Sequence, residues 1–148
     1  MSFLKAFKLH IPPHTDINSS FIAKDVMTKI TCQLNEKTSI KDAIDILELN
    51  KISGAPVVDE KNLVVGFLSE KDCLKYLYEI TYYRLPHGLV TDYMSKDVIA
   101  LSEEDTDEHI LALFVKSSFH LIPVVGQNNL LLGVVHRSRV LAKLKNFY

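Results

Sequence analysis

The chain contains an internal repeat with a constant offset of 67 residues and no gap. Between residues 25–74 and 92–141, 12 of the 50 aligned pairs are identical, whereas about three are expected by chance at ordinary residue usage. The identities include Met27 with Met94 and Gly66 with Gly133. One supersecondary unit is therefore used twice. Two copies related by a pseudo-twofold axis predict a cleft between them, and function should be sought in that cleft.

The first copy reads as strand, helix, strand, strand and helix. A short strand is expected at 30–32, and Thr38 or Ser39 can cap the helix that follows. Apolar residues recur at helical spacing over 40–47, and β-branched runs with a polar turn between them indicate two strands. The remaining expected segments are strands at 57–58 and 63–68 and a helix at 70–83.

The second copy follows the same order. The expected segments are a strand at 98–100, a helix with its apolar stripe over 110–114, strands at 122–125 and 130–135, and a closing helix at 138–147. Asp105, with Glu108 three residues later, is predicted to cap the first of these helices. Because a unit of about 50 residues buries too little surface alone, we expect two β-α-β-β-α units in one α+β domain with a shared core.

The predicted organisation has four parts. They are an N-terminal arm (1–24), a first motif (25–83), a linker (84–91) and a second motif (92–148). The formal net charge of −1 argues against nucleic-acid binding through a broad basic face. We expect no secretory signal, no membrane span and no metal site, and the two cysteines, Cys32 and Cys73, indicate buried thiols in a reducing cytoplasm.

Ordered segments in both copies are similar to those of one known family. The chain resembles a tandem pair of the CBS motif, named for cystathionine beta-synthase, over about 120 of its 148 residues. The segments that carry the resemblance are Val26-Met27-Thr28, 52–59 (ISGAPVVD) and 65–72 (VGFLSEKD) in the first copy, and Tyr93-Met94-Ser95, 121–125 (LIPVV) and 132–135 (LGVV) in the second.

The resemblance implies a non-catalytic regulatory module. Such pairs commonly bind adenosine-containing ligands between the motifs and often stack into dimers. An adenine nucleotide is then a regulatory ligand and no cofactor is required. As a stand-alone pair, this chain is expected to form a homodimer and to regulate a separate protein. The alternative is a ligand-free dimerisation scaffold, and an enzyme is a distant third because no nucleophile-base pair or carboxylate dyad stands out.

Asp72 is the strongest candidate for ligand binding. The segment 66–72 matches the family pattern that ends in an acid holding the ribose. A carboxylate offers two acceptor oxygens to the two adjacent hydroxyls of a ribose. Ser69 lies on the same face of the strand-to-helix turn and can reach a ribose or phosphate oxygen. Alternatively, Ser69 and Asp72 merely cap the helix.

The resemblance implies an adenine surrounding in the first half. Its residues are Ile30, Thr31, Gly54, Ala55 and Pro56. Flat apolar contacts together with backbone amides and carbonyls would hold a purine there. The alternative for Ile30 is plain core packing, and Gly54 can simply end a helix.

The second copy departs from the ligand pattern. His136 and Arg139 stand where the first copy has Ser69 and Asp72. A guanidinium has only donors and cannot accept from ribose hydroxyls. Either the second site is inactive, or Arg137 and Arg139 supply positive charge to the phosphates of a nucleotide held by the first site. His120 is placed where some family members direct a histidine toward phosphate, although a structural histidine is the alternative.

Four tyrosines surround the last helix of the first copy. They are Tyr76, Tyr78, Tyr82 and Tyr83. A helix that is apolar nearly all round must be covered. We expect a second subunit to cover it, with the N-terminal arm as the alternative.

Overall fold

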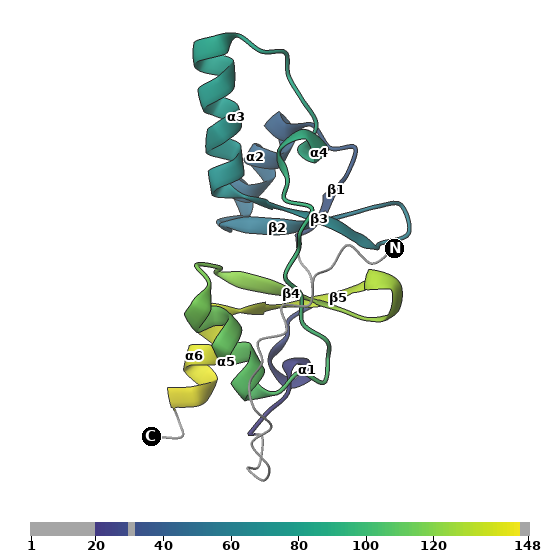
Figure 1. The fold of residues 1–148 in the computed structure, drawn as a ribbon, viewed down its shortest axis with the longest axis vertical. Helices are drawn as coiled ribbons and strands as arrows, with labels where there is room; N and C mark the ends of the chain where they lie inside the picture. Colours follow the sequence, from purple (N-terminus) through teal and green to yellow (C-terminus); the bar gives the residue numbers. More distant parts are fainter. Residues whose placement is uncertain (1–19, 30–31, 146–148) are drawn as a thin grey trace.

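The computed structural model describes residues 20–29 and 32–145 of the chain (Figure 1). In chain order its elements are α1 (Ala23–Val26), β1 (Leu34–Asn35), α2 (Ile40–Asn50), β2 (Gly54–Val58), β3 (Val64–Ser69), α3 (Glu70–Tyr83), α4 (Val90–Tyr93), α5 (Asp107–Lys116), β4 (Leu121–Val125), the 3₁₀ turn η1 (Gln127–Asn129), β5 (Leu131–His136) and α6 (Arg137–Leu144). The predicted mixed α/β architecture with two motifs is confirmed.

Side-chain caps fix where the long helices begin. Ser39 caps α2 by accepting a hydrogen bond from the Asp42 amide, and the buried residues Ile40, Ala43 and Leu47 then face the sheet. The predicted cap at Asp105 is wrong. Thr106 caps α5 instead, while the Asp105 carboxylate accepts from the Ser102 amide. The repeat explains this outcome, because Thr106 is aligned with Ser39.

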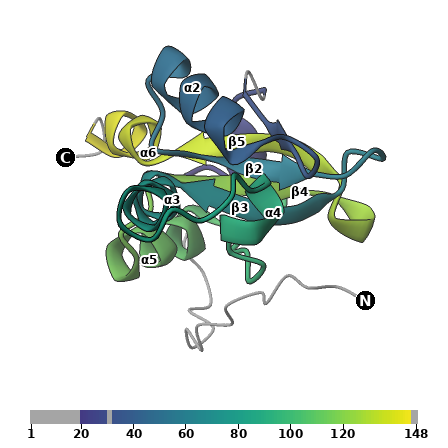
Figure 2. The same ribbon diagram turned by 90° about the horizontal axis from the view of Figure 1, so that it is seen from above.

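Each half contains one small sheet. In the first half the order is β1-β2-β3, with β1 parallel and β3 antiparallel to β2. In the second half β4 pairs antiparallel with β5. The strand predicted at 98–100 is wrong, because Leu101 makes only an isolated parallel bridge to Val124. The sheets of the two halves meet at the middle of the molecule and the longer helices lie toward its two ends (Figures 1 and 2).

Isolated bridges between the halves show the pseudo-twofold axis. They come in pairs whose members differ by the repeat offset: Thr28 with Val134 and Ser95 with Phe67, and Ile22 with Thr106 and Leu89 with Ser39. A further bridge joins Leu63 to its own counterpart, Leu130. Equivalent residues of the two copies therefore make equivalent contacts with the opposite copy, as a twofold axis requires.

The short helices α1 and α4 pack in the opposite half. Phe21, Ala23 and Val26 are buried with α5, β4 and β5 of the second half, and Val90 is buried with α2 and β2 of the first. The backbone follows the same exchange, because the Ala23 amide donates to the Asp105 carbonyl at 2.9 Å. Part of the segment assigned to the arm from the sequence thus belongs to the second core.

The interior consists of three hydrophobic clusters. One lies in each half, and the third joins the two sheets at the centre through Val58, Val64, Val98 and Leu131. The repeated glycine is required by this close contact between the halves. A Cβ at Gly133 would lie 2.7 Å from the carbonyl oxygen of Thr28, and a Cβ at Gly66 would meet the side chain of Met94, which is aligned with Met27.

Candidate functional site

Two hollows lie between the halves, and Leu121 lines both of them. The small hollow has a volume of about 130 Å³ and the large hollow about 680 Å³. The lining of the small hollow consists of Phe67, Ser69, Asp72, Ser95, Asp97, Val98, Ile99, Phe119, Leu121, Ile122 and Pro123. Its walls are therefore mostly apolar, with two carboxylates as its charged groups.

The start of α3 holds the Asp72 carboxylate at the small hollow. Asp72 Oδ2 accepts from the Ser69 amide and from the Ser69 hydroxyl, both at 2.9 Å, while Ser69 Oγ accepts from the Asp72 amide at 3.2 Å. This reciprocal capping box was the structural alternative for these two residues, and it is present. Among the described residues nothing donates to Oδ1. The hydrogen bonds from Ser69 therefore orient the Asp72 carboxylate through Oδ2 and leave Oδ1 without a partner among the described residues.

The second copy supplies most of the apolar wall around Asp72. Leu121 and Pro123, which are aligned with Gly54 and Pro56, line the small hollow. Gly54, Ala55 and Pro56 are themselves buried in β2 and line neither hollow. Ile30 and Thr31 lie outside the described residues.

Gly54 is close to the small hollow through Phe67. A Cβ at Gly54 would lie 2.6 Å from Phe67 Cε1, so the missing side chain leaves room for a ring that lines the hollow. Sequence reasoning placed Asp72 with its own copy and missed Asp97, Val98 and Phe119. The signal available was the pseudo-twofold axis itself, which brings the start of α3 against the opposite copy.

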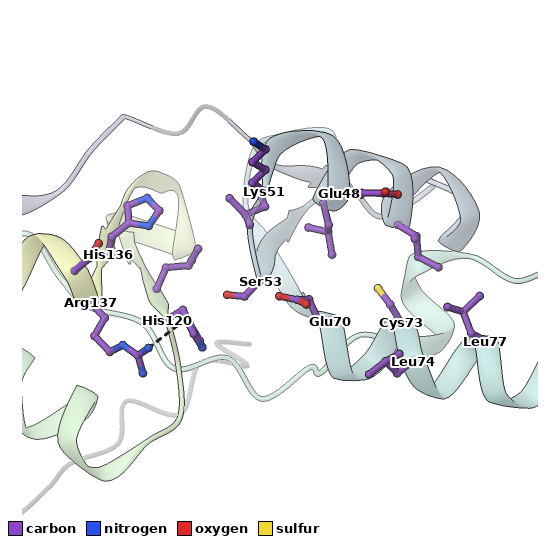
Figure 3. A pocket seen from close by; sticks show the side chains of 15 residues that line it. Glu48, Lys51, Ser53, Glu70, Cys73, Leu74, Leu77, His120, His136 and Arg137 are labelled. Atoms are coloured by element: carbon purple, nitrogen blue, oxygen red, sulfur yellow. Dashed lines mark hydrogen bonds between the residues drawn. The ribbon is translucent and has the colours of Figure 1, made fainter.

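The large hollow lies beside the helices of the first half (Figure 3). Its first wall comes from α2 and α3 and the segment between them: Ile44, Leu47, Glu48, Lys51, Ile52, Ser53, Glu70, Cys73, Leu74 and Leu77. His120, Leu121, His136, Arg137 and Ser138 of the second half complete the lining. Among these, Ser53 and Glu70 are aligned with His120 and Arg137. The pseudo-twofold axis thus places an acid opposite a base.

The structure brings His120 and Arg137 together. Arg137 Nη2 lies 3.3 Å from His120 Nδ1, and the Arg137 amide donates to the His120 carbonyl at 2.8 Å (Figure 3). Both side chains are exposed at the large hollow. Arg139 is also exposed but lines neither hollow. His120 and Arg137, two of the three residues predicted to contact phosphate, are therefore neighbours. Their hollow adjoins the small hollow, which contains Asp72, at Leu121.

The environment of His136 favours the neutral imidazole. Partial burial lowers the pKa of His136 below its ordinary value of 6.5, and the positive charge of Arg139 lowers it further. Protons then bind the unfolded state more readily than the folded state, so stability is lost as the pH falls through 6.5 and below.

Replacing His136 by Gln should reduce the pH dependence of folding. We expect the wild-type protein to lose more stability than His136→Gln when urea unfolding is compared on the two sides of pH 6.5. Equal loss in wild type and His136→Gln would contradict the assignment.

The thiol at the large hollow is poorly suited to nucleophilic chemistry. Burial, followed by the negative charges of Asp72 and Glu70, raises the pKa of Cys73 to about 11. The reactive form of cysteine is the thiolate, which is scarce at neutral pH when the pKa is raised. Cys73 therefore acts as a packing residue at this wall.

The described part of the chain carries neither a cluster of metal ligands nor a membrane-spanning helix. Within residues 20–29 and 32–145, no group of three or more His, Cys, Asp or Glu side chains is placed to hold a metal ion. In the same residues, no helix is long and apolar enough to cross a lipid bilayer.

Known proteins share both the sequence pattern and the fold. Inosine-5'-monophosphate dehydrogenase of Methanocaldococcus jannaschii is 28% identical over 123 residues, which cover 83% of this chain but 23% of that protein. This chain thus spans about a quarter of that relative's length.

Solved structures resemble nearly the whole described chain. CBSX2 in complex with AMP has a TM-score of 0.74 at 24% identity, over 86% of this chain and 98% of that chain. The CBS domain pair of protein MJ0100, in complex with 5'-methylthioadenosine and S-adenosyl-L-methionine, has a TM-score of 0.73 at 23% identity, over the same 86% and 98%. At these identities the likeness establishes the fold.

The CBS domain model matches residues 23–79 and 90–146, in agreement with the two halves of the structure. The chain belongs to the CBS domain family and contains the domain twice.

Proposed function

We propose that the chain binds an adenosine-containing ligand in the small hollow and acts as a non-catalytic sensor. The observation that carries this function is the position of Asp72, whose carboxylate is oriented by Ser69 and has Oδ1 available at the hollow. Because the Ser69 hydroxyl proton already points to Asp72, Ser69 Oγ would accept from the ligand rather than donate to it. Ribose hydroxyls supply the donors that both groups need.

The apolar wall opposite Asp72 suits a purine ring. Val98, Ile99 and Ile122 come from the second copy, and Phe67 and Phe119 add two aromatic side chains. A purine buried there would gain apolar and aromatic contacts while its sugar faced the carboxylate. The AMP, methylthioadenosine and S-adenosylmethionine in the two related structures support this class of ligand.

The size of the small hollow has a consequence for sensing. About 130 Å³ is less than the several hundred Å³ typical of ligand sites. A whole nucleotide must therefore extend past Leu121 into the large hollow, or separate the halves. In the first case its phosphates would approach His120 and Arg137. In the second, binding would change the geometry between the halves, which is the signal that a regulated protein could read.

A thermal shift series tests the proposed function. AMP, ADP, ATP and S-adenosylmethionine at millimolar concentration should raise the melting temperature, because a ligand that binds only the folded state stabilises it. A ligand present at about 100 times its Kd adds about 2.7 kcal/mol of stability. Absence of a shift with every compound would favour the ligand-free scaffold instead.

An exposed apolar face supports homodimer formation, the feature shared by both candidate functions. Leu74 on α3 and its aligned residue Leu141 on α6 are 64% and 70% exposed. Tyr78, Tyr82 and Tyr83 are exposed on α3, whereas Tyr76 is buried within the half. Figures 1 and 2 show α3, α5 and α6 on the same side of the molecule. A second copy would cover this face and its apolar side chains.

Charges on this face should separate the subunits. We expect the double variant Leu74→Asp/Leu141→Asp to be monomeric by light scattering, whereas wild type is dimeric, because buried unpaired carboxylates are costly. Lys61→Asp, in the turn between β2 and β3, is the control for the added negative charge. A monomeric wild type, or a double variant that stays dimeric, would contradict this interface.

A further inference from the structure

Asp97 is the second carboxylate of the small hollow and has no acidic counterpart in the first copy, where Ile30 stands at the aligned position. It follows α4 and comes two residues after Ser95, which is paired with Phe67. The Ser95 hydroxyl donates to the Asp97 backbone carbonyl at 3.4 Å. Within residues 20–29 and 32–145, the Asp97 carboxylate accepts no hydrogen bond. Asp97 is exposed and lines the hollow, so a ligand there can reach its carboxylate.

The charge of the small hollow determines what it can accept. Asp72 comes from the first half and Asp97 from the second, and no lining residue of this hollow is cationic. Two ionised carboxylates facing one space repel each other unless donors lie between them. A neutral ligand group with N–H or O–H donors at two ends satisfies both, whereas a phosphate placed between them would be repelled. The nucleoside part of the ligand fits this space, and the phosphates belong outside it.

We infer that Asp97 selects the base by accepting a hydrogen bond from the 6-amino group of adenine. This inference rests on the proposed function, in which Asp72 holds the ribose of the same ligand. A carboxylate only accepts hydrogen bonds. Adenine presents an N6 amino donor, whereas hypoxanthine carries a carbonyl oxygen at the same position. The amino group is attracted to Asp97 and the carbonyl is repelled. Asp97 is thus a specificity-determining residue that favours adenosine over inosine compounds.

Three nucleotides that share the same ribose and phosphate isolate this contact. They are AMP, purine riboside 5'-monophosphate, which lacks the amino group, and IMP, which has a carbonyl instead. For the wild-type protein, calorimetry should give AMP binding roughly tenfold tighter than purine riboside 5'-monophosphate, the loss expected for one hydrogen bond to a charged group. IMP should bind most weakly, because its carbonyl faces a carboxylate.

Asp97→Asn changes the chemistry while keeping the shape. An amide both donates and accepts, so it can bond either an amino group or a carbonyl. The preference for AMP over IMP should then fall toward one. Asp72→Ala should weaken all three nucleotides by a similar factor and leave the preference unchanged. Lys96→Ala, beside Asp97 but outside the hollow, should change neither affinity nor preference.

The outcomes separate the inference from the proposed function. If AMP binding depends on Asp72 but the AMP-to-IMP preference is the same in wild type and Asp97→Asn, the role of Asp97 is overturned and the proposed function stands. If wild type binds none of the three nucleotides, both are overturned. A preference that collapses only in Asp97→Asn supports the assignment.

Discussion

Replacing Asp72 by Ala should weaken binding of AMP by roughly ten- to a hundredfold. A hydrogen bond to a charged group contributes about 1.5–3 kcal/mol, and each 1.4 kcal/mol corresponds to a factor of ten in Kd. The substitution removes the carboxylate that lines the small hollow, so the ribose hydroxyls lose their charged acceptor. Isothermal titration of the folded variant against wild type measures the change directly.

The helix cap complicates this substitution and calls for two controls. Asp72→Ala also removes the acceptor of the Ser69 amide, which should cost about 1 kcal/mol of folding stability. Asp92 plays the same capping role for α4 by accepting from the Leu89 amide at 2.8 Å, but lines neither hollow. Asp92→Ala should therefore lose similar stability without losing affinity.

Asp72→Asn separates the two roles within one residue. Its carbonyl oxygen can still accept from the Ser69 amide, whereas its amino group would face the ribose hydroxyls as a donor. We expect nearly normal stability with weakened binding. Wild-type affinity in both Asp72→Ala and Asp72→Asn would remove this residue from the ligand site.

Replacing Phe21 by Ala should destabilise the protein by about 3–5 kcal/mol, the usual cost of truncating a buried phenylalanine. Phe21 is 3% exposed and packs in the core of the second half, although the sequence places it before the first copy. Chemical denaturation gives the free energy of unfolding. Leu49→Ala is the control, because Leu49 on α2 is 83% exposed and its truncation should change stability by no more than about 0.5 kcal/mol.

Hydrogen exchange locates the damage caused by Phe21→Ala. Amides of α5, whose residues Ile110 and Phe114 share a cluster with Phe21, should lose protection before those of α2. We expect this order because Phe21 and α1 pack against α5 in the second half and not against α2 in the first. A loss of stability no larger than that of Leu49→Ala, or a loss of protection confined to α2, would contradict the packing described above.

The order of elements could be predicted because it depends on local signals. The helix at 70–83 is found with the predicted bounds, since its capping residues and its apolar pattern lie within one segment. The prediction for the cap of α5 is wrong because Asp105 and Thr106 are both good capping residues. Only the folded backbone shows at which of the two the helix begins. The repeat does not decide between them either, because Thr38, aligned with Asp105, is as good a candidate from the sequence as Ser39, aligned with Thr106.

The partners across the pseudo-twofold axis could not be predicted from local patterns. The sequence shows that Val90 and Phe21 are apolar, but it does not show which half of the molecule buries each of them. For the same reason the lining of the small hollow could not be assigned. Gly54 pairs with Ser69 in the sheet, yet neither Gly54 nor Ala55 lines a hollow, and most of the apolar residues around Asp72 come from the second copy. Which surfaces of two copies meet depends on their packing as a whole. The duplication predicts a cleft, but only the folded arrangement of the two copies assigns its walls.

The difference between the two copies has a functional meaning under this account. Asp72 is replaced by Arg139 at the aligned position, and the large hollow carries His120 and Arg137 instead of a second ribose carboxylate. If the proposed function holds, such an asymmetric pair would bind one ligand in one orientation. The nucleoside would lie at the acidic small hollow and its phosphates toward the basic side chains.

Binding of the nucleoside between the two copies can be tested by a methyl NMR titration with adenosine, which has no phosphate to draw it toward Arg137. Adenosine bound in the small hollow should shift the methyl signals of Val98, Ile99 and Ile122, which belong to the copy opposite Asp72. Methyl groups of Leu47, in the large hollow, should change little. Changes centred on Leu47, or no changes at any of these methyl groups at millimolar adenosine, would mean that the small hollow is not the nucleoside site.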